Sequence, residues 1–361
     1  MLSTHKFTKP RAAVRLLLSA LTMLVAATLF SLPADAQRAA PTDLTSDIPN
    51  VGAFNDTHLV NPWGLSVSPS GPWWVSDNGT GLSTLYIATG APQGLVVTIP
   101  GVGGNTGTPS GTVYNGTSDF KIHGTPAVFL FVSEDGNLSG WYAGTSANLV
   151  LNTPNAVYKG LALASAGGAN YLYAANFHNN SVDVFDANFA SHSFGSNAFQ
   201  DSTVPTGYAP FNVQNIGGGK LAVTFAKQDA NKHDDVPGRG NGYVDIFDTS
   251  GNLLTRLQHN IYLNSPWGIA VAPASGFGGF GGDILVGQFG SGAILAYTPA
   301  GVFSGILLDP ASLQLQIDGL WALAFGNGGS AGPTTTLFFT AAAFGEAHGI
   351  LGSMTCCSTG P

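Results

Sequence analysis

The feature that most constrains the fold is a pair of short strands that occurs twice. Residues 61–67 read Asn-Pro-Trp-Gly-Leu-Ser-Val, and residues 73–79 read Trp-Trp-Val-Ser-Asp-Asn-Gly. In the second half of the chain, Ser-Pro-Trp-Gly-Ile-Ala-Val at 265–271 precedes Asp-Ile-Leu-Val-Gly-Gln-Phe-Gly at 283–290. A repeat of this kind predicts stacked or radial units.

Six units align by their first strand. They begin at Pro62–Leu65, Val113–Gly116, Tyr158–Leu161, Pro210–Val213, Pro266–Ile269 and Leu320–Leu323. Each start is followed by two strands flanking a turn with Gly or Asn, which is a hairpin signal. The spacing of about 45 to 55 residues is the size of a propeller blade. We therefore predict an all-β fold, a six-bladed β-propeller over residues 37–354, with a β-sandwich as the alternative.

The last unit has no fourth strand of its own. Residues 44–50, Leu-Thr-Ser-Asp-Ile-Pro-Asn, resemble the fourth strands near 95–101 and 148–155. An N-terminal strand that completed the last blade would close the ring and leave no open sheet edge there. We expect this closure between residues 42–48 and 348–354. We also expect Gly64, Gly160 and Gly268 to lie where the inner strands crowd the axis.

The first 36 residues resemble a secretory signal peptide. Four basic residues precede the largely apolar run Leu16–Phe30, and Ala34-Asp35-Ala36 offers small residues for cleavage before Gln37. The run of 15 residues is shorter than the roughly 20 that a membrane-spanning helix needs. The expectation is a secreted or periplasmic protein with no membrane span after cleavage; an uncleaved anchor is the alternative.

Charge and cysteine content limit the partners. Cleavage would remove four of the 12 basic and one of the 20 acidic residues, which leaves a net charge of −11. Nucleic acid is not expected as a partner, because phosphate binding needs a cationic surface. The only cysteines, Cys356 and Cys357, are adjacent and lie in residues 355–361, which we expect to form a flexible tail. The expected state is a monomer held by its core.

The repeats resemble NHL-type repeats, in which Pro-x-Gly-Ile/Val-Ala-Val precedes a strand that ends in Asp or Asn and a Gly or Asn turn. Residues 62–67 with 77–79, 171–180 and 266–271 carry this pattern. Over residues 42–354 the chain also resembles an uncharacterised family of exported bacterial propeller proteins, which shares the Asn-Pro-Trp-Gly opening. The resemblance implies the fold and export but no reaction. The Arg common in the NHL turn is absent here, and the fourth unit carries a long insert.

The propeller topology predicts one binding surface. Inner-strand starts and the turns between second and third strands open on the same face, the mouth of the central channel. The expected binding residues are Trp63, Asp77, Asn78, Tyr114, Glu134, Asp135, Lys159, Asn176, His178, Phe211, Lys227, Trp267, Gln288, Trp321, Glu346 and His348. Aromatic faces beside a few polar groups suit a small molecule, a carbohydrate or a protein surface. In the alternative, the aromatic rings pack between blades as core, and the turn carboxylates are solvated.

The fourth unit carries an insert at residues 227–242, the most charged stretch after the signal segment, which we expect to cap the mouth. At every second position from 229 to 235 the insert carries a potential metal ligand: Asp229, Asn231, His233 and Asp235. Their oxygen and imidazole atoms suit calcium only in part. No cofactor is expected, with calcium or another divalent metal as the alternative.

No standard catalytic signature occurs, such as Gly-x-Ser-x-Gly, His-Glu-x-x-His or a phosphate loop. The main prediction is therefore a binding module that uses the mouth and has no assigned catalytic residue. One alternative is a metal-dependent hydrolase or lactonase that uses Glu134, His178, Glu346 and His348. The other is an extracellular structural or surface-associated protein.

Overall fold

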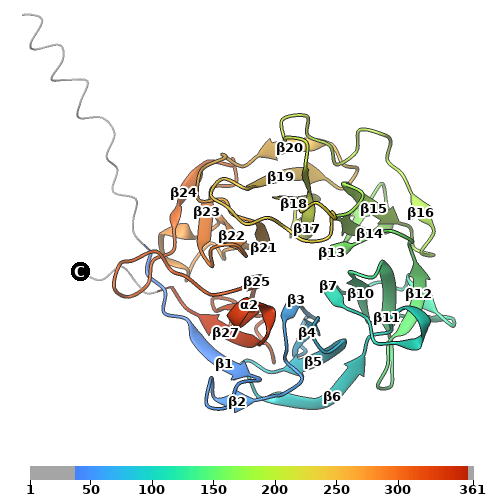
Figure 1. The fold of residues 1–361 in the computed structure, drawn as a ribbon, viewed down its shortest axis with the longest axis horizontal. Helices are drawn as coiled ribbons and strands as arrows, with labels where there is room; N and C mark the ends of the chain where they lie inside the picture. The colour runs from blue at the N-terminus through green and yellow to red at the C-terminus, as the bar shows by residue number, and fades with distance from the viewer. Residues whose placement is uncertain (1–36, 357–361) are drawn as a thin grey trace, which may run out of the picture. The chain divides into compact units, whose positions relative to one another are not determined.

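The computed structural model describes residues 37–356, and these residues form six small antiparallel sheets arranged around a centre (Figure 1). The predicted all-β, six-bladed propeller is therefore confirmed. The signal segment 1–36 lies outside the described residues. Within residues 37–356, no helix has the length and the apolar character needed to cross a membrane.

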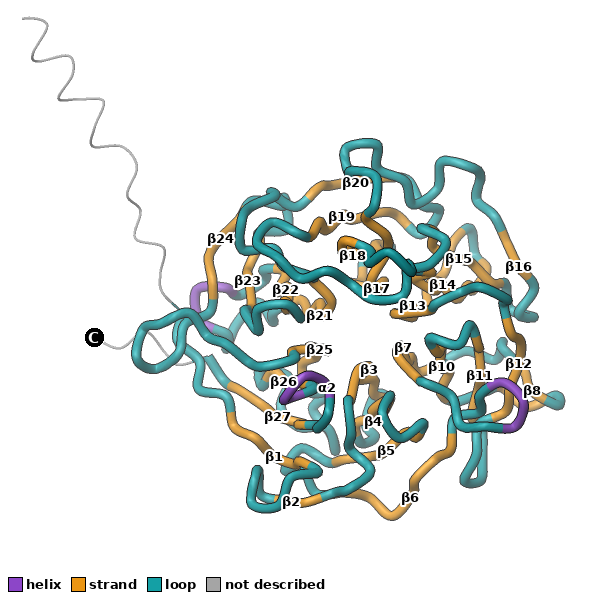
Figure 2. Tube along the Cα trace, viewed as in Figure 1, coloured by secondary structure: helices purple, strands orange, loops and turns teal. Residues whose placement is uncertain are grey.

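Five blades have four strands each, and Figure 2 shows these strands as separate groups joined by loops. Blade one contains β3 (Pro62–Val67), β4 (Trp73–Asp77), β5 (Leu82–Tyr86) and β6 (Pro92–Thr98). Blade two contains β7 (Pro109–Tyr114), β10 (Phe129–Ser133), β11 (Asn137–Trp141) and β12 (Asn148–Asn152). Blade three contains β13 (Tyr158–Ala166), β14 (Ala169–Asn176), β15 (Ser181–Phe185) and β16 (Ser191–His192).

Blades four and five repeat the same order. Blade four contains β17 (Tyr208–Gly217), β18 (Lys220–Lys227), β19 (Gly242–Asp248) and β20 (Leu253–Arg256). Blade five contains β21 (Pro266–Val271), β22 (Ile284–Gln288), β23 (Ile294–Tyr297) and β24 (Phe303–Ile306). Short elements outside the blades are β8 (Lys121–Ile122), β9 (Thr125–Pro126), η1 (Val102–Gly104), η2 (Gly278–Phe280) and α2 (Ala343–Glu346).

Blade six is assembled from both ends of the chain. Its order is β2 (Phe54–Asn55), β1 (Thr42–Ser46), β27 (Ile350–Met354), β26 (Leu337–Ala341) and β25 (Leu320–Phe325). Strand β1 pairs antiparallel with β27, and Ser46 Oγ donates a hydrogen bond of 2.8 Å to the carbonyl of Gly349. The predicted closure is confirmed. The tail begins later than expected, because Cys356 still pairs with Ala39 in an isolated bridge.

The core lies between neighbouring sheets because both faces of each strand are apolar. Leu130 and Leu172 share a cluster between blades two and three, and Ile246 and Val286 share one between blades four and five. At the axis the inner strands approach closely: a Cβ atom on Gly64 would lie 2.5 Å from the carbonyl oxygen of Ser110. The crowding predicted for Gly64, Gly160 and Gly268 is confirmed.

Candidate functional site

Each inner strand has a register irregularity at its start, and this irregularity aims one side chain at the axis. In β3 the shift lies between Pro62 and Leu65, and in β21 it lies between Pro266 and Ile269. Such bulges redirect a side chain away from the regular alternation of a strand. The equivalent positions, which we call the axial residues, are Trp63, Ser110, Lys159, Phe211, Trp267 and Trp321.

Tyr114 is not an axial residue, and its predicted place at the mouth is wrong. It ends β7 and packs against Phe129, with a ring separation of 5.5 Å, in the cluster between blades one and two. Ser110 takes the axial position and donates a hydrogen bond of 2.6 Å to the carbonyl of Tyr158. The sequence signal for this register is Pro109-Ser110-Gly111, which repeats the Pro-x-Gly of residues 62–64.

The axial aromatic side chains close the channel. Trp321 is stacked between Trp63 at 3.6 Å and Phe289 at 3.9 Å, and it meets Trp267 edge-on at 5.7 Å. We name this group, with Phe211 and Phe177, the aromatic plug. Its axial members are buried, so they are core and not the open wall of a binding site. The structure therefore agrees with the alternative prediction, in which these rings pack as core.

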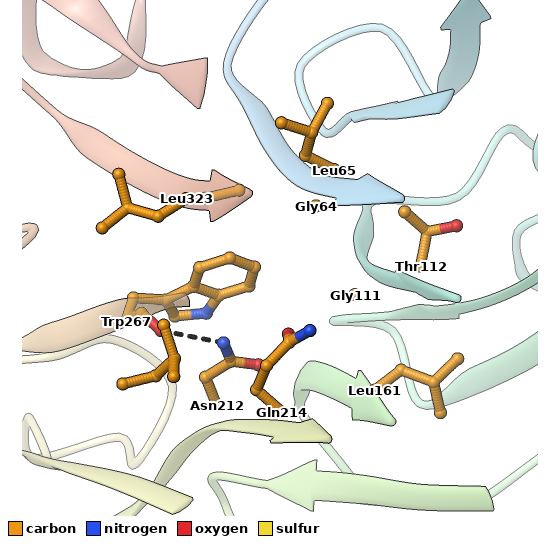
Figure 3. Close-up of a pocket in the computed structure, with 11 residues that line it drawn as sticks. Gly64, Leu65, Gly111, Thr112, Leu161, Asn212, Gln214, Trp267 and Leu323 are labelled. Carbon is orange, nitrogen blue, oxygen red and sulfur yellow. Dashed lines mark hydrogen bonds between the residues drawn. The ribbon is translucent and has the colours of Figure 1, made fainter. Parts of the chain in front are cut away.

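Below the plug the channel is narrow. Figure 3 shows the residues that line it, and Asn212 Nδ2 donates a hydrogen bond of 2.8 Å to the carbonyl of Trp267 in the neighbouring blade. The cavity measures about 10 Å³, which is room for one water molecule. This part of the channel therefore has no room for a ligand larger than water.

Lys159 lies on the mouth side of the plug. Its side chain is 1% exposed, and its Nζ atom forms an ion pair with Glu134 and lies 3.4 Å from Asp234 Oδ1. The same Nζ lies 5.0 Å from the centre of the Trp63 ring, within the range of a cation–π contact. Burial, the largest single effect, lowers the pKa of Lys159, but the charges and hydrogen bonds of Glu134 and Asp234 together outweigh it and raise the pKa. The lysine is therefore a permanent cation at neutral pH and not a nucleophile.

A chain of hydrogen bonds joins the plug to this ion pair. Asn61 Oδ1 accepts hydrogen bonds from the indole nitrogens of Trp63, at 2.9 Å, and Trp321, at 3.3 Å. Asn61 Nδ2 donates to Asn78 Oδ1 at 3.3 Å, and Asn78 Nδ2 donates to Glu134 Oε2 at 2.7 Å. Asn78 and Glu134 thus lie at the mouth as predicted. Sequence reasoning did not select Asn61, although it opens the repeated Asn-Pro-Trp-Gly segment.

The insert in blade four reaches the mouth. Asp229 Oδ1 accepts hydrogen bonds from the backbone nitrogens of His233 and Asp234, and this turn directs Asp234 toward Lys159. Gln228 Nε2 donates to the carbonyl of Phe177 at 2.5 Å and fixes the base of the insert to blade three. The side chain of Asp234 remains 68% exposed. The insert therefore covers Lys159 and leaves carboxylate oxygens open to solvent.

Glu346 approaches the same charges from blade six. Its turn, α2, lies close to the centre of the ring in Figure 1 and is left-handed, with φ of 55° at Phe344 and 66° at Glu346. Side chains rarely adopt these angles, and such strain is common at functional sites. Glu346 is exposed to solvent, and its carboxyl group is only partly desolvated. Desolvation, and then the charge of Glu134, raise the pKa of Glu346 to about 7.

We call Glu134, Asp234, Asp235 and Glu346, gathered around Lys159, the acidic mouth. After desolvation and the charge of Glu134, the charges of Asp234 and Asp235 also raise the pKa of Glu346. Burial also raises the pKa of Asp235. Two of these carboxylates contact the ammonium of Lys159, and the other two add negative charge nearby, so the arrangement favours a positively charged group.

Several predicted site residues are instead part of the framework. Asp77 and Asn176 are buried and bonded to Thr84 and Asp183 within their own blades. Gln288 is buried and accepts a hydrogen bond of 2.8 Å from the backbone of Asn264. Asp135 bonds Asn137 in its turn. The structure does not bring these side chains to the acidic mouth.

The remaining polar predictions also lie apart from the acidic mouth. His348 Nδ1 is 2.8 Å from Asp47 Oδ2, so it helps to join the N-terminal segment to blade six. His178 and Lys227 form no side-chain hydrogen bond or ion pair among residues 37–356. In that part of the chain, the one group suited to a metal ion combines Glu134, His233 and Asp234, with ligand atoms within 4.8 Å of one another. The set Glu134, His178, Glu346 and His348 does not form such a group.

Comparison with known proteins identifies viral relatives. The chain is 31% identical over 331 residues to the uncharacterised protein R648 of Acanthamoeba polyphaga mimivirus, covering 86% of this chain and 78% of that protein. It is also 31% identical over 326 residues to protein L690 of the same virus, covering 84% and 82%. No family model matches the chain, so the resemblance to NHL repeats stays a prediction.

Solved structures share the fold at low sequence identity. A streptogramin B lyase aligns over 88% of this chain and 98% of its own, with a TM-score of 0.53 and 10% identity. A protein of unknown function from Bacteroides thetaiotaomicron aligns over 89% and 76%, with a TM-score of 0.54 and 10% identity. At this identity the likeness supports the propeller fold alone. The chain therefore belongs to the family of the uncharacterised mimivirus proteins R648 and L690, and its sequence folds as a six-bladed β-propeller.

Proposed function

We propose that the protein is a binding module whose acidic mouth takes a ligand with a positively charged group. The observation that carries this proposal is the excess of carboxylates at one place: Glu134 and Asp234 contact the ammonium of Lys159, and Asp235 and Glu346 lie close enough to feel its charge. A ligand cation would relieve the repulsion among these carboxylates. It would contact mainly Asp234 and Glu346, because Glu134 is already bonded to Lys159 and Asn78.

An organic cation suits this surface better than a neutral sugar. The aromatic plug is buried, so its rings are not available for stacking against a sugar. Phe344 is available: it is 72% exposed and lies on the same left-handed turn as Glu346. An aromatic face beside a carboxylate offers both charge attraction and a cation–π contact to an amine.

Isothermal titration with the diamine putrescine at pH 6 and pH 8 tests this proposal. A bound cation favours ionised Glu346, so affinity should rise as pH increases through about 7, with release of a proton on binding at the lower pH. Glu346→Gln should weaken binding and remove its pH dependence. Asp43→Asn, which alters an exposed carboxylate on outer strand β1, is the matched control. Equal binding by wild type and Glu346→Gln would refute the proposal.

A metal-dependent hydrolase or lactonase is the second candidate. It is favoured by one observation, the group of Glu134, His233 and Asp234. These residues would hold a divalent ion, which would activate water or polarise a carbonyl. The fit is partial, because both oxygens of Glu134 already have partners and a metal ion would compete with the ammonium of Lys159. Elemental analysis of the wild type and of His233→Ala tests this candidate. One equivalent of metal in the wild type, and none in the variant, would support it.

The proposal also covers where the protein is located and whether it is a monomer. We propose a secreted or periplasmic monomer with NHL-like repeats, supported by the signal-like residues 1–36 and the repeated Pro-x-Gly strands. N-terminal sequencing of the exported protein should show that the mature chain begins at Gln37. A surface-associated structural role would instead require the residues near Cys356 and Cys357, and unchanged surface retention after their removal would refute it.

A further inference from the structure

A second pocket lies on the same side of the propeller as the mouth but shares no residue with it. It has a volume of about 260 Å³, close to the lower limit of ligand pockets. Four loops meet there: the blade-four insert and the loops after β20, β22 and β24. The lining residues are Arg239, Ile261, Tyr262, Asn264, Ser291 and Gln314.

Three side chains that line this pocket can donate hydrogen bonds and have donor groups without an acceptor among residues 37–356. The Arg239 side chain is exposed and forms no ion pair within residues 37–356. Asn264 is only 9% exposed; its Oδ1 accepts a hydrogen bond of 2.5 Å from Gly238, while its Nδ2 has no acceptor within the same residues. The buried Oγ of Ser291 also lacks a partner there. Solvent reaches Asn264 Nδ2, so this amide is free to donate to a ligand acceptor, whereas leaving the buried Ser291 Oγ without a partner is costly.

The charge of this pocket is the reverse of the acidic mouth. None of its lining residues is acidic, and Arg239 supplies a positive charge. An arginine guanidinium matches the two oxygens of a carboxylate with two parallel hydrogen bonds. The acceptor that fits the free donors of Arg239 and Asn264 is therefore a carboxylate.

Beside these donors the pocket has an apolar wall formed by Tyr262 and Ile261. Tyr262 and Ile261 are 39% and 54% exposed. The Tyr262 ring lies parallel to Phe303 at 6.2 Å, and its backbone nitrogen donates to Asn260 Oδ1 at 2.9 Å. Asn260 Nδ2 in turn donates to the Tyr297 hydroxyl at 2.9 Å. These contacts prepare a flat apolar surface beside the charged donors.

We propose that this pocket binds a small organic carboxylate. The carboxylate is held by the Arg239 guanidinium and Asn264 Nδ2, and the ligand's ring or apolar body lies against Tyr262 and Ile261. This site is independent of the cation site proposed at the acidic mouth, because the two take ligands of opposite charge and use different residues.

Titration of the full mature protein with benzoate, followed by ligand-observed NMR and calorimetry, tests the proposal. Benzoate should bind saturably, and benzamide, which lacks the charge, should bind on the order of tenfold more weakly. Arg239→Gln and Asn264→Asp should each weaken benzoate binding by a similar factor. Asn264→Asp keeps the Gly238 hydrogen bond while replacing the donor with an oxygen, and circular dichroism confirms that each variant is folded.

Lys232→Gln is the matched control, since it removes a positive charge from the same insert outside the pocket. It should leave benzoate affinity unchanged. Equal affinity for benzoate and benzamide, or no effect of Arg239→Gln and Asn264→Asp, would overturn the proposal. Displacement of benzoate by inorganic phosphate at equal concentration would also overturn it, because the site would then recognise oxyanions in general.

Discussion

Substitutions of Lys159 and Glu134 should have strongly non-additive effects on the free energy of unfolding, because the two side chains form an ion pair. The Lys159 side chain is 1% exposed and that of Glu134 is 11% exposed, so removal of either charge leaves the other in a poorly solvated place. Breaking a buried pair from one side costs about 3–5 kcal/mol in free energy of unfolding. The cost of Glu134→Gln should lie in this range, because the nearest remaining counter-charge is Asp234, which is 3.4 Å away and exposed.

Lys159→Met should cost less, about 2 kcal/mol, since Glu134 keeps its 2.7 Å hydrogen bond from Asn78 and some contact with water. The double variant removes both charges and should be about 2–3 kcal/mol more stable than the sum of the single effects predicts. Urea unfolding of all four proteins measures this coupling. The cycle of Glu134→Gln with Lys227→Met, an exposed lysine without an ion pair within residues 37–356, is the control and should be additive. Additivity of the Lys159 cycle within about 0.5 kcal/mol would refute the reasoning.

Three further predictions concern the core and its charges. Trp321→Ala should lower the free energy of unfolding by about 3–5 kcal/mol, because this ring is stacked on both sides; a loss below about 1 kcal/mol in chemical denaturation would contradict its place in the plug. Gly64→Val should destabilise by about 1–3 kcal/mol through its contact with the Ser110 carbonyl, whereas Gly94→Val, with open space around it, should have a smaller effect in the same assay. Burial, and then the charge of Asp201, raise the pKa of Asp245 from 3.8 to about 7, so its contribution to stability is full below about pH 4 and is lost progressively as pH rises to about 7. Thermal unfolding of Asp245→Asn should therefore show a smaller loss of stability between pH 4 and pH 7 than wild type, and identical pH profiles would contradict the assignment.

The fold was predictable because its signals are local and repeated. The Pro-x-Gly starts mark the inner strands, and residues 44–50 resemble the fourth strands closely enough to predict pairing with blade six. Blade two shows where this reasoning fails. Val113 to Gly116 offered an aromatic residue and a glycine, but the true register begins at Pro109, where the axial residue is Ser110 and the aromatic signal is missing.

The candidate site was predictable only in part. Asn78, Glu134, Lys159 and Glu346 follow from propeller topology, since the ends of inner strands and the turns between strands two and three meet on one face. The burial of the aromatic rings was not predictable, because sequence spacing does not give the radius of the channel. The path of the insert depends on tertiary contacts such as Gln228 to Phe177, so its Asp234 was missed.

The pKa of Glu346 tests the central claim most directly, because it reports whether carboxylates from three blades meet around Lys159. Carbon-13 NMR of glutamate-labelled protein should give a pKa of about 7 for this carboxyl group, falling when Glu134→Gln removes the adjacent charge or when putrescine is added. An ordinary glutamate pKa that neither change affects would contradict the account of the acidic mouth.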